Sequence, residues 1–223
     1  MPLPRLLQLL DAEVLDSEWF AKAITHRSAS KKNNERLEFL GDSVLSLVIA
    51  NHLFERFPDV NEGDLSRLRS HLVRGATLAR IAADNQLGDY LKLGAGELKS
   101  GGFRRESIME DAFEAIIGAA YLVKGFDYVR GYILDVFRDE LANLPDPASL
   151  KDPKSRLQEW LQSRSRPLPE YRVLDISGEA HDQTFTAECR VSEPEIVTQA
   201  QGSSRRKAEQ AAAALALEKV LDA

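Results

Sequence analysis

Hydrophobic residues recur at intervals of three and four in the part of the chain before residue 145. The spacing is clearest where these apolar residues share one predicted helix face: Leu37, Leu40, Val44, Leu47 and Val48. It returns at 65–72 and at 78–82, and this is the period of an amphipathic α-helix. The segment 111–123 is apolar nearly all round, which is typical of a buried helix. The pattern therefore predicts an all-α domain, interrupted by a glycine-rich loop at 94–102.

The pattern changes after a proline-rich segment. Three prolines lie between residues 145 and 153. Proline lacks an amide donor and disfavours helix in the residue before it, so a linker is expected at 146–152. Beyond it, alternation at period two predicts strands between two helices. The predicted elements are a helix, three strands and a helix: 154–162, 171–175, 184–188, 196–200 and 205–221.

The sequence thus predicts a multidomain protein. Residues 1–145 form an all-α domain, and residues 153–223 form a small α+β domain with the order α-β-β-β-α. A domain of about 70 residues is long enough to bury a core of its own.

Composition narrows the class of protein. Hydrophobic residues make up 43% of the chain and charged residues 29%, as in globular proteins. No apolar run reaches the roughly 18 residues that a spanning helix needs, and the first residues contain no signal-peptide cleavage site. A single cysteine, Cys189, excludes an intrachain disulfide framework and a multi-cysteine zinc site. We expect a cytoplasmic protein with no membrane partner.

The net charge of −6 argues against a nucleic-acid partner when taken alone. Its distribution changes this conclusion. After residue 150 the chain has 11 Lys and Arg against 12 Asp and Glu, so a local basic patch can dominate there. The acidic excess lies in the first domain, where it can serve a cation.

Carboxylates recur at helical spacing in two segments of the first domain. Glu35, Glu38 and Asp42 share a helix face, where like charges repel. Asp111 and Glu114 share a face at the start of the apolar helix, where an isolated charge is costly. If the two helices face each other, the side chains form an all-oxygen site suited to Mg²⁺ or Mn²⁺. Such a site suggests metal-assisted hydrolysis of a phosphodiester.

Other interpretations of these residues stay open. The first acidic segment also fits a solvated face, and Asp111 also fits a purely stabilising role at a helix N-terminus. The glycines form no P-loop or dinucleotide fingerprint, so we expect no nucleotide cofactor. Lys99, Arg104 and Arg105 fit a flexible loop and a phosphate contact equally well.

A basic cluster begins the last predicted helix, directly after a serine that is predicted to be its N-cap. It comprises Ser204, Arg205, Arg206 and Lys207. Cations are unfavourable at a helix N-terminus unless an anion binds there. Gln158 and Glu159 on the preceding helix and His181 in the hairpin loop can reach the same ligand. Separated contacts of this kind fit double-stranded RNA, and the alternative is an ordinary solvated cluster.

These segments together resemble bacterial ribonuclease III. The resemblance is carried by residues 34–43, whose sequence is Asn-Glu-Arg-Leu-Glu-Phe-Leu-Gly-Asp-Ser, and by 97–107, 111–114 and 152–221, and it covers almost the whole chain. It implies an endonuclease domain, a double-stranded-RNA-binding domain and a homodimer. It also implies Mg²⁺-dependent cleavage of both strands of duplex RNA to 5′-phosphate and 3′-hydroxyl ends, with ribosomal precursor RNA and other structured transcripts as substrates.

The resemblance implies roles for individual residues. The metal ligands of the family match three carboxylates: Glu38, Asp111 and Glu114. Asp42 and Glu114 match catalytic positions, and Glu35 and Glu62 match acidic positions tied to substrate handling or the dimer interface. The RNA-contacting elements contain Gln158, Glu159, His181, Ser204, Arg205, Arg206 and Lys207. Glu209 stands where related RNA-binding domains often have a lysine, which argues against a phosphate contact there.

Two rival functions remain open. A non-catalytic duplex-RNA-binding protein would keep the nuclease fold for dimerisation alone, but it would not need four clustered acids. A helical phosphohydrolase acting on small molecules usually combines His and Asp ligands, and His52 and His71 have no suitable partners. A homodimer has a rationale of its own, because two-fold symmetry provides one acidic cluster for each RNA strand.

Overall fold

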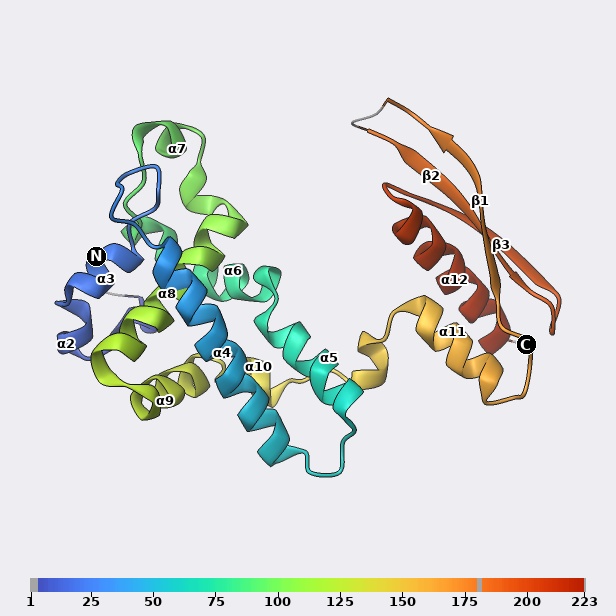
Figure 1. The fold of residues 1–223 in the computed structure, drawn as a ribbon, viewed down its shortest axis with the longest axis horizontal. Coiled ribbons are helices and arrows are strands. Elements are labelled where there is room, and N and C mark those ends of the chain that lie inside the picture. Colours follow the sequence, from blue (N-terminus) through green and yellow to red (C-terminus); the bar gives the residue numbers. More distant parts are fainter. Residues whose placement is uncertain (1–3, 180–181, 223) are drawn as a thin grey trace. The chain divides into compact units, whose positions relative to one another are not determined.

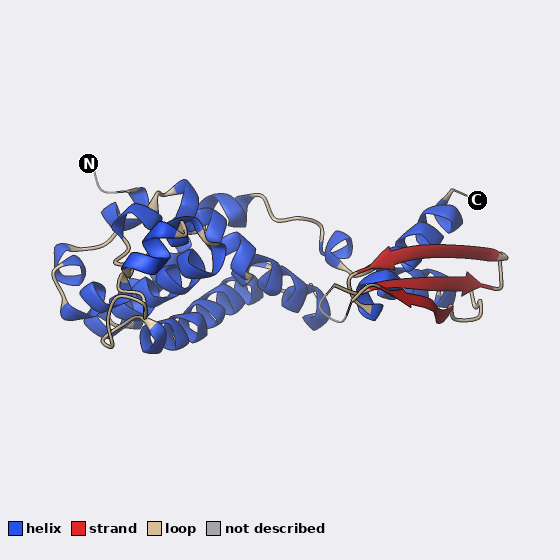
Figure 2. Cartoon of the chain, turned by 90° about the horizontal axis from the view of Figure 1, so that it is seen from above, coloured by secondary structure: helices blue, strands red, loops and turns tan. Residues whose placement is uncertain are grey.

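The computed structural model describes residues 4–179 and 182–222. Contacts divide the chain into two compact units, residues 1–150 and 151–223. Helices build the first unit, and the strands lie in the second (Figure 2). The predicted fold class, an all-α domain followed by an α+β domain, is confirmed.

The first unit is helical, as the apolar spacing predicts. Its α-helices are α1 (Arg5–Gln8), α2 (Ala12–Leu15), α3 (Glu18–Ala23), α4 (Glu35–Arg56), α5 (Glu62–Val73), α6 (Gly75–Asp84), α7 (Ala95–Lys99), α8 (Glu106–Lys124), α9 (Phe126–Val136) and α10 (Arg138–Ala142). Short 3₁₀ turns are η1 (Leu87–Tyr90), η2 (Gly102–Arg104) and η3 (Pro147–Leu150).

Helices α4 and α8 form the centre of this unit (Figure 1). They approach so closely that a Cβ atom on Gly41 would overlap the carbonyl oxygen of Glu114, and one on Gly118 would overlap that of Leu37. Only glycine leaves room for this backbone contact. The crossing therefore fixes the register between the two acidic segments.

The core around this crossing explains why α4 and α8 are so apolar. Leu45 and Ile49 of α4 and Ile116 of α8 are fully buried, and the rings of Phe113 and Phe137 stack with centroids 6.2 Å apart. By length and composition alone α4 is also able to span a membrane. In this unit its buried side chains instead pack into the core of a folded domain.

The prediction of a plain loop at 94–102 is wrong in part. Residues Ala95–Lys99 form the short helix α7, and η2 follows it. The residues between the glycines include Ala, Glu, Leu and Lys, which favour helix. Gly101, with φ of +74°, reverses the chain after this turn, a conformation that suits glycine.

The second unit is an antiparallel sheet packed against helices. It contains α11 (Pro153–Gln162), β1 (Glu170–Ser177), β2 (Thr184–Val191), β3 (Ile196–Gly202) and α12 (Arg205–Leu221). The strand order is β1-β2-β3. Small residues on α12, such as Ala212 and Ala216, are buried with Leu157, Cys189 and Val191. Their short side chains let α12 lie close to the sheet.

Candidate functional site

Four carboxylates from two helices lie around the α4–α8 crossing. Glu38 and Asp42 come from α4, and Asp111 and Glu114 come from α8. Glu114 is only 7% exposed. Burial, followed by the charges of Asp42, Glu110, Glu38 and Asp111, raises the pKa of Glu114 to about 8. Helical spacing predicts which acids share a face of one helix, but it cannot predict which helices meet. The structure shows that the acidic faces of α4 and α8 meet at this crossing.

The pKa values of Glu38 and Asp111 are raised as well. Burial, then the charges of Asp111 and Glu35, raises the pKa of Glu38. Burial also raises the pKa of Asp111, whereas His26 and Arg27 oppose this rise. Glu35 itself is exposed and lies 3.5 Å from the guanidinium of Arg27. It therefore belongs to the rim of the cluster.

The chemistry of this donor set fits a hard divalent cation. Within the described residues, no three of these side chains converge at metal-binding geometry, so they would have to adjust on binding. The cluster nevertheless consists of oxygen donors alone, as Mg²⁺ and Mn²⁺ prefer. The raised pKa of Glu114 means that the protein provides too little positive charge to stabilise its ionised carboxylate. A bound cation would provide that charge.

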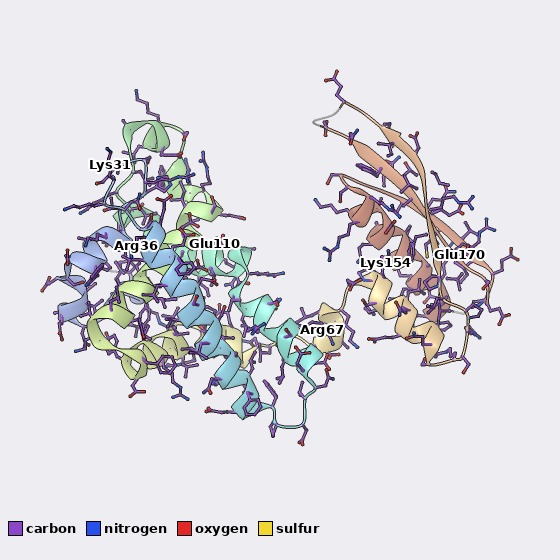
Figure 3. The ribbon with its side chains drawn as sticks, in the orientation of Figure 1. Lys31, Arg36, Arg67, Glu110, Lys154 and Glu170 are labelled. Carbon is purple, nitrogen blue, oxygen red and sulfur yellow. The ribbon has the colours of Figure 1, made fainter. Side chains whose placement is uncertain are left out.

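Sequence reasoning missed Glu110. This side chain is half-buried on α8 and lies against Gly75 at the start of α6 (Figure 3). Burial, followed by the charges of Asp111 and Asp42, raises the pKa of Glu110. The available signal was its position four residues before Glu114, which places both acids on one helix face.

Glu62 lies elsewhere in the unit. It is exposed in the first turn of α5 and lines a groove of about 340 Å³ between α4 and α5. Leu47 and Phe54 line the same groove. Together with Phe39, they form an exposed apolar stripe along α4, in which Phe39 is 78% and Phe54 71% exposed.

The basic cluster lies in the first turn of α12. Ser204 caps the helix, since its hydroxyl accepts a hydrogen bond of 3.3 Å from the amide of Lys207. The side chains of Arg205, Arg206 and Lys207 are exposed. Lys207 donates through Nζ to Ser203 at 3.1 Å. The amide groups of this turn and its cations therefore present one positive surface.

The second predicted RNA-contacting element is the exposed face of α11. Gln158 and Glu159 both lie on it, and Glu159 forms an ion pair of 2.7 Å with Lys151. Helices α11 and α12 pack against each other in one unit. His181, the third predicted contact, lies outside the described residues.

Comparison with protein families matches both units. Residues 16–140 match the family model described as Ribonuclease-III-like, and residues 153–220 match the double-stranded RNA binding motif. A ribonuclease 3 of Vibrio vulnificus is 56% identical over 219 residues, which are 98% of this chain and 97% of the relative. This chain belongs to the ribonuclease III family. The resemblance inferred from the acidic segments and the basic helix is thereby confirmed.

Other members of the family agree. A ribonuclease 3 of Shewanella amazonensis is 57% identical over 216 residues, covering 97% of this chain and 96% of the relative. Among solved structures, the nuclease domain of ribonuclease III from Campylobacter jejuni is 42% identical, with a TM-score of 0.58. It covers 63% of this chain, and 96% of that domain is matched. Ribonuclease III membership supports an RNA-cleaving enzyme and disfavours the non-catalytic alternative.

Proposed function

We propose that this chain is a Mg²⁺-dependent endoribonuclease that cuts both strands of double-stranded RNA. Residues 1–145 would carry the nuclease chemistry, residues 146–152 would act as a linker, and residues 153–223 would bind the duplex. The observation that carries the proposal is Glu114, a buried carboxylate among other carboxylates with a pKa of about 8. A protein gains nothing in stability from this arrangement, so a bound cation is its natural explanation.

Glu38, Asp111 and Glu114 are the residues that would hold the metal ion, and Mn²⁺ has the same preference for oxygen ligands. A bound Mg²⁺ would stabilise negative charge on the phosphate and make water a better nucleophile. Asp42 is exposed beside them, so its carboxylate would be accessible to a bound RNA and would be able to accept a proton there. Glu35 and Glu62, on the rim of the cluster and on α5, would act in substrate handling or at the dimer interface.

The basic end of α12 and the exposed face of α11 would bind the RNA. The proposed contacts are Gln158, Glu159, His181, Ser204, Arg205, Arg206 and Lys207. Cations and backbone amides at a helix N-terminus bind phosphate, whereas polar side chains on α11 suit the shallow minor groove of duplex RNA. Because such contacts read shape, they add little sequence preference.

The proposed active form is a homodimer. The exposed apolar stripe on α4 would be covered by a second copy, since large apolar patches on a soluble domain usually mark interfaces. The ribonuclease III nuclease domain of Campylobacter jejuni, 39% identical to this chain with a TM-score of 0.56, has a region involved in dimer formation. Two-fold symmetry would then give each RNA strand its own acidic cluster.

We place this activity in the cytoplasm. The products would carry 5′-phosphates and 3′-hydroxyls. The substrates would be ribosomal precursor RNA and other structured messenger and transfer RNA transcripts.

The test is incubation of the purified chain with a long, perfectly paired RNA duplex, with Mg²⁺, with Mn²⁺ or with EDTA. Short products on a denaturing gel with either metal, and none with EDTA, are expected. Single-stranded RNA of the same sequence is the control and should stay intact. A duplex that stays uncut with Mg²⁺ but is retarded on a native gel would replace the proposal with a binding-only function.

A further inference from the structure

Glu209 is a buried acid at the basic end of α12. Its side chain is 9% exposed, and both carboxylate oxygens are paired. Oε1 accepts a hydrogen bond of 2.8 Å from Nε of Arg205, and Oε2 accepts one of 2.7 Å from Nζ of Lys154. Burial alone would raise the pKa of Glu209, but the hydrogen bonds from Arg205 and Lys154 lower it below its ordinary value. The group is therefore a charged acceptor for two cations.

The pairing holds Arg205 through one nitrogen only. The side chain of Arg205 is 70% exposed, and within the described residues its terminal nitrogens have no other protein partner. A guanidinium donates from several positions in a fixed plane. Fixing Nε on Glu209 thus restricts the plane of the guanidinium while its outer N–H groups stay available for a phosphate.

The same acid ties α12 to α11. Lys154 lies at the start of α11 (Figure 3), with Nζ 4.0 Å from the centre of the Tyr171 ring. Beside it, the Lys154 amide donates to Oε1 of Gln210 at 3.1 Å, and Nε2 of Gln210 donates to Asp152 at 2.7 Å. These contacts connect the two helices that carry the proposed RNA contacts.

The geometry points to Glu209 as a positioning residue for RNA binding, which holds Arg205 in the orientation that meets a phosphate and fixes α11 relative to α12. This inference rests on the proposed function, in which Arg205 contacts RNA. Glu209 would increase the affinity for RNA by preorganisation, because ordering a long arginine side chain on binding costs free energy. It also explains how an acid is tolerated beside an anion site: two cations outweigh its charge.

The test measures binding of the full chain to a fluorescent RNA duplex in EDTA at several KCl concentrations. Glu209→Gln keeps the shape of the side chain but removes its charge. We expect affinity to fall about five-fold, and the slope of log affinity against log salt to lose about one unit, as for one lost phosphate contact. Glu218→Gln, an exposed site on the same helix, is the matched control and should bind as the wild type does.

A double-mutant cycle separates positioning from a general loss of structure. If Glu209 acts through Arg205, Glu209→Gln should change affinity much less when Arg205 is already Ala. Equal weakening on both backgrounds, or unchanged binding of Glu209→Gln, would overturn the inference. Arg205→Ala and Lys207→Ala that each bind as the wild type does would instead refute the proposed RNA contact itself. Thermal unfolding of each variant checks that the second unit is folded.

Discussion

At the scale of single residues, Glu114 is the most informative side chain in the molecule. Replacing it by Gln preserves its shape and removes the charge that a cation would balance. We expect duplex binding to change little, because the RNA contacts proposed above lie in the other unit. Cleavage with Mg²⁺ should fall by at least about 100-fold, the usual cost of removing a group that acts on the reacting atoms.

Gel-based cleavage rates and native-gel binding measure the two effects separately. Glu218→Gln serves again as the control, since it removes one carboxylate from the other unit. Preserved cleavage by Glu114→Gln at ordinary Mg²⁺ concentrations would remove Glu114 from the site.

The pKa of Glu114 also predicts how stability depends on pH. It is raised from 4.5 to about 8 on folding. Between these values the folded state holds a proton that the unfolded chain releases, so stability is highest at low pH in this range and falls as pH rises toward 8. In EDTA, the melting temperature should therefore fall from pH 5.5 to pH 8 by several degrees more in the wild type than in Glu114→Gln, because each kcal/mol shifts it by about 2–4 °C.

Addition of Mg²⁺ at pH 8 should raise the melting temperature of the wild type, since a ligand that binds only the folded state stabilises it. Glu114→Gln should gain less from the metal. Parallel pH profiles of the two proteins would show that Glu114 does not cause the dependence.

At the scale of elements, the α4–α8 crossing depends on two glycines. A methyl group on Gly41 or Gly118 would overlap the backbone of the other helix. Forced overpacking of a core costs about 1–3 kcal/mol, and more where backbone must move. Gly41→Ala should therefore lower the melting temperature and weaken cleavage, because the two acidic segments separate.

Gly131 on α9 provides the matched control. A Cβ atom there meets nothing within 4 Å, and alanine favours helix over glycine by about 1 kcal/mol. Gly131→Ala should keep or raise the melting temperature and keep cleavage. Thermal unfolding of both variants tests whether the α4–α8 contact requires glycine. Equal stability of Gly41→Ala and Gly131→Ala would contradict that requirement.

At the scale of the whole molecule, the apolar stripe on α4 predicts assembly. Phe54→Asp should cost the isolated chain little, because Phe54 is mostly exposed, but a charge there opposes burial against a second copy. Light scattering with size-exclusion chromatography should show a dimer for the wild type and a shift toward monomer for Phe54→Asp. Leu168→Asp, at an exposed apolar site in the other unit, should remain dimeric; equal behaviour of both variants would contradict an α4 interface.

The sequence alone determined the features that depend on neighbours along the chain. Period three to four predicted the helices of the first unit, and the change to period two predicted the sheet. Spacing of three and four residues placed Glu38 beside Asp42 and Asp111 beside Glu114, because residues on one helix face must be neighbours. Ser204 was identifiable as a helix cap for the same local reason.

Only the tertiary structure decided how these elements meet. The glycine contact between α4 and α8 brings the two acidic pairs together, and Glu110 lies beside them. Glu62 instead lies at a separate groove. In the sequence, Glu209 departs from the lysine that related RNA-binding domains often have. The packing of α11 on α12 shows that it pairs with Lys154 and Arg205. The physical reason is that burial and Coulomb interactions depend on distances between elements, whereas periodicity along the sequence reports only which side chains share a face.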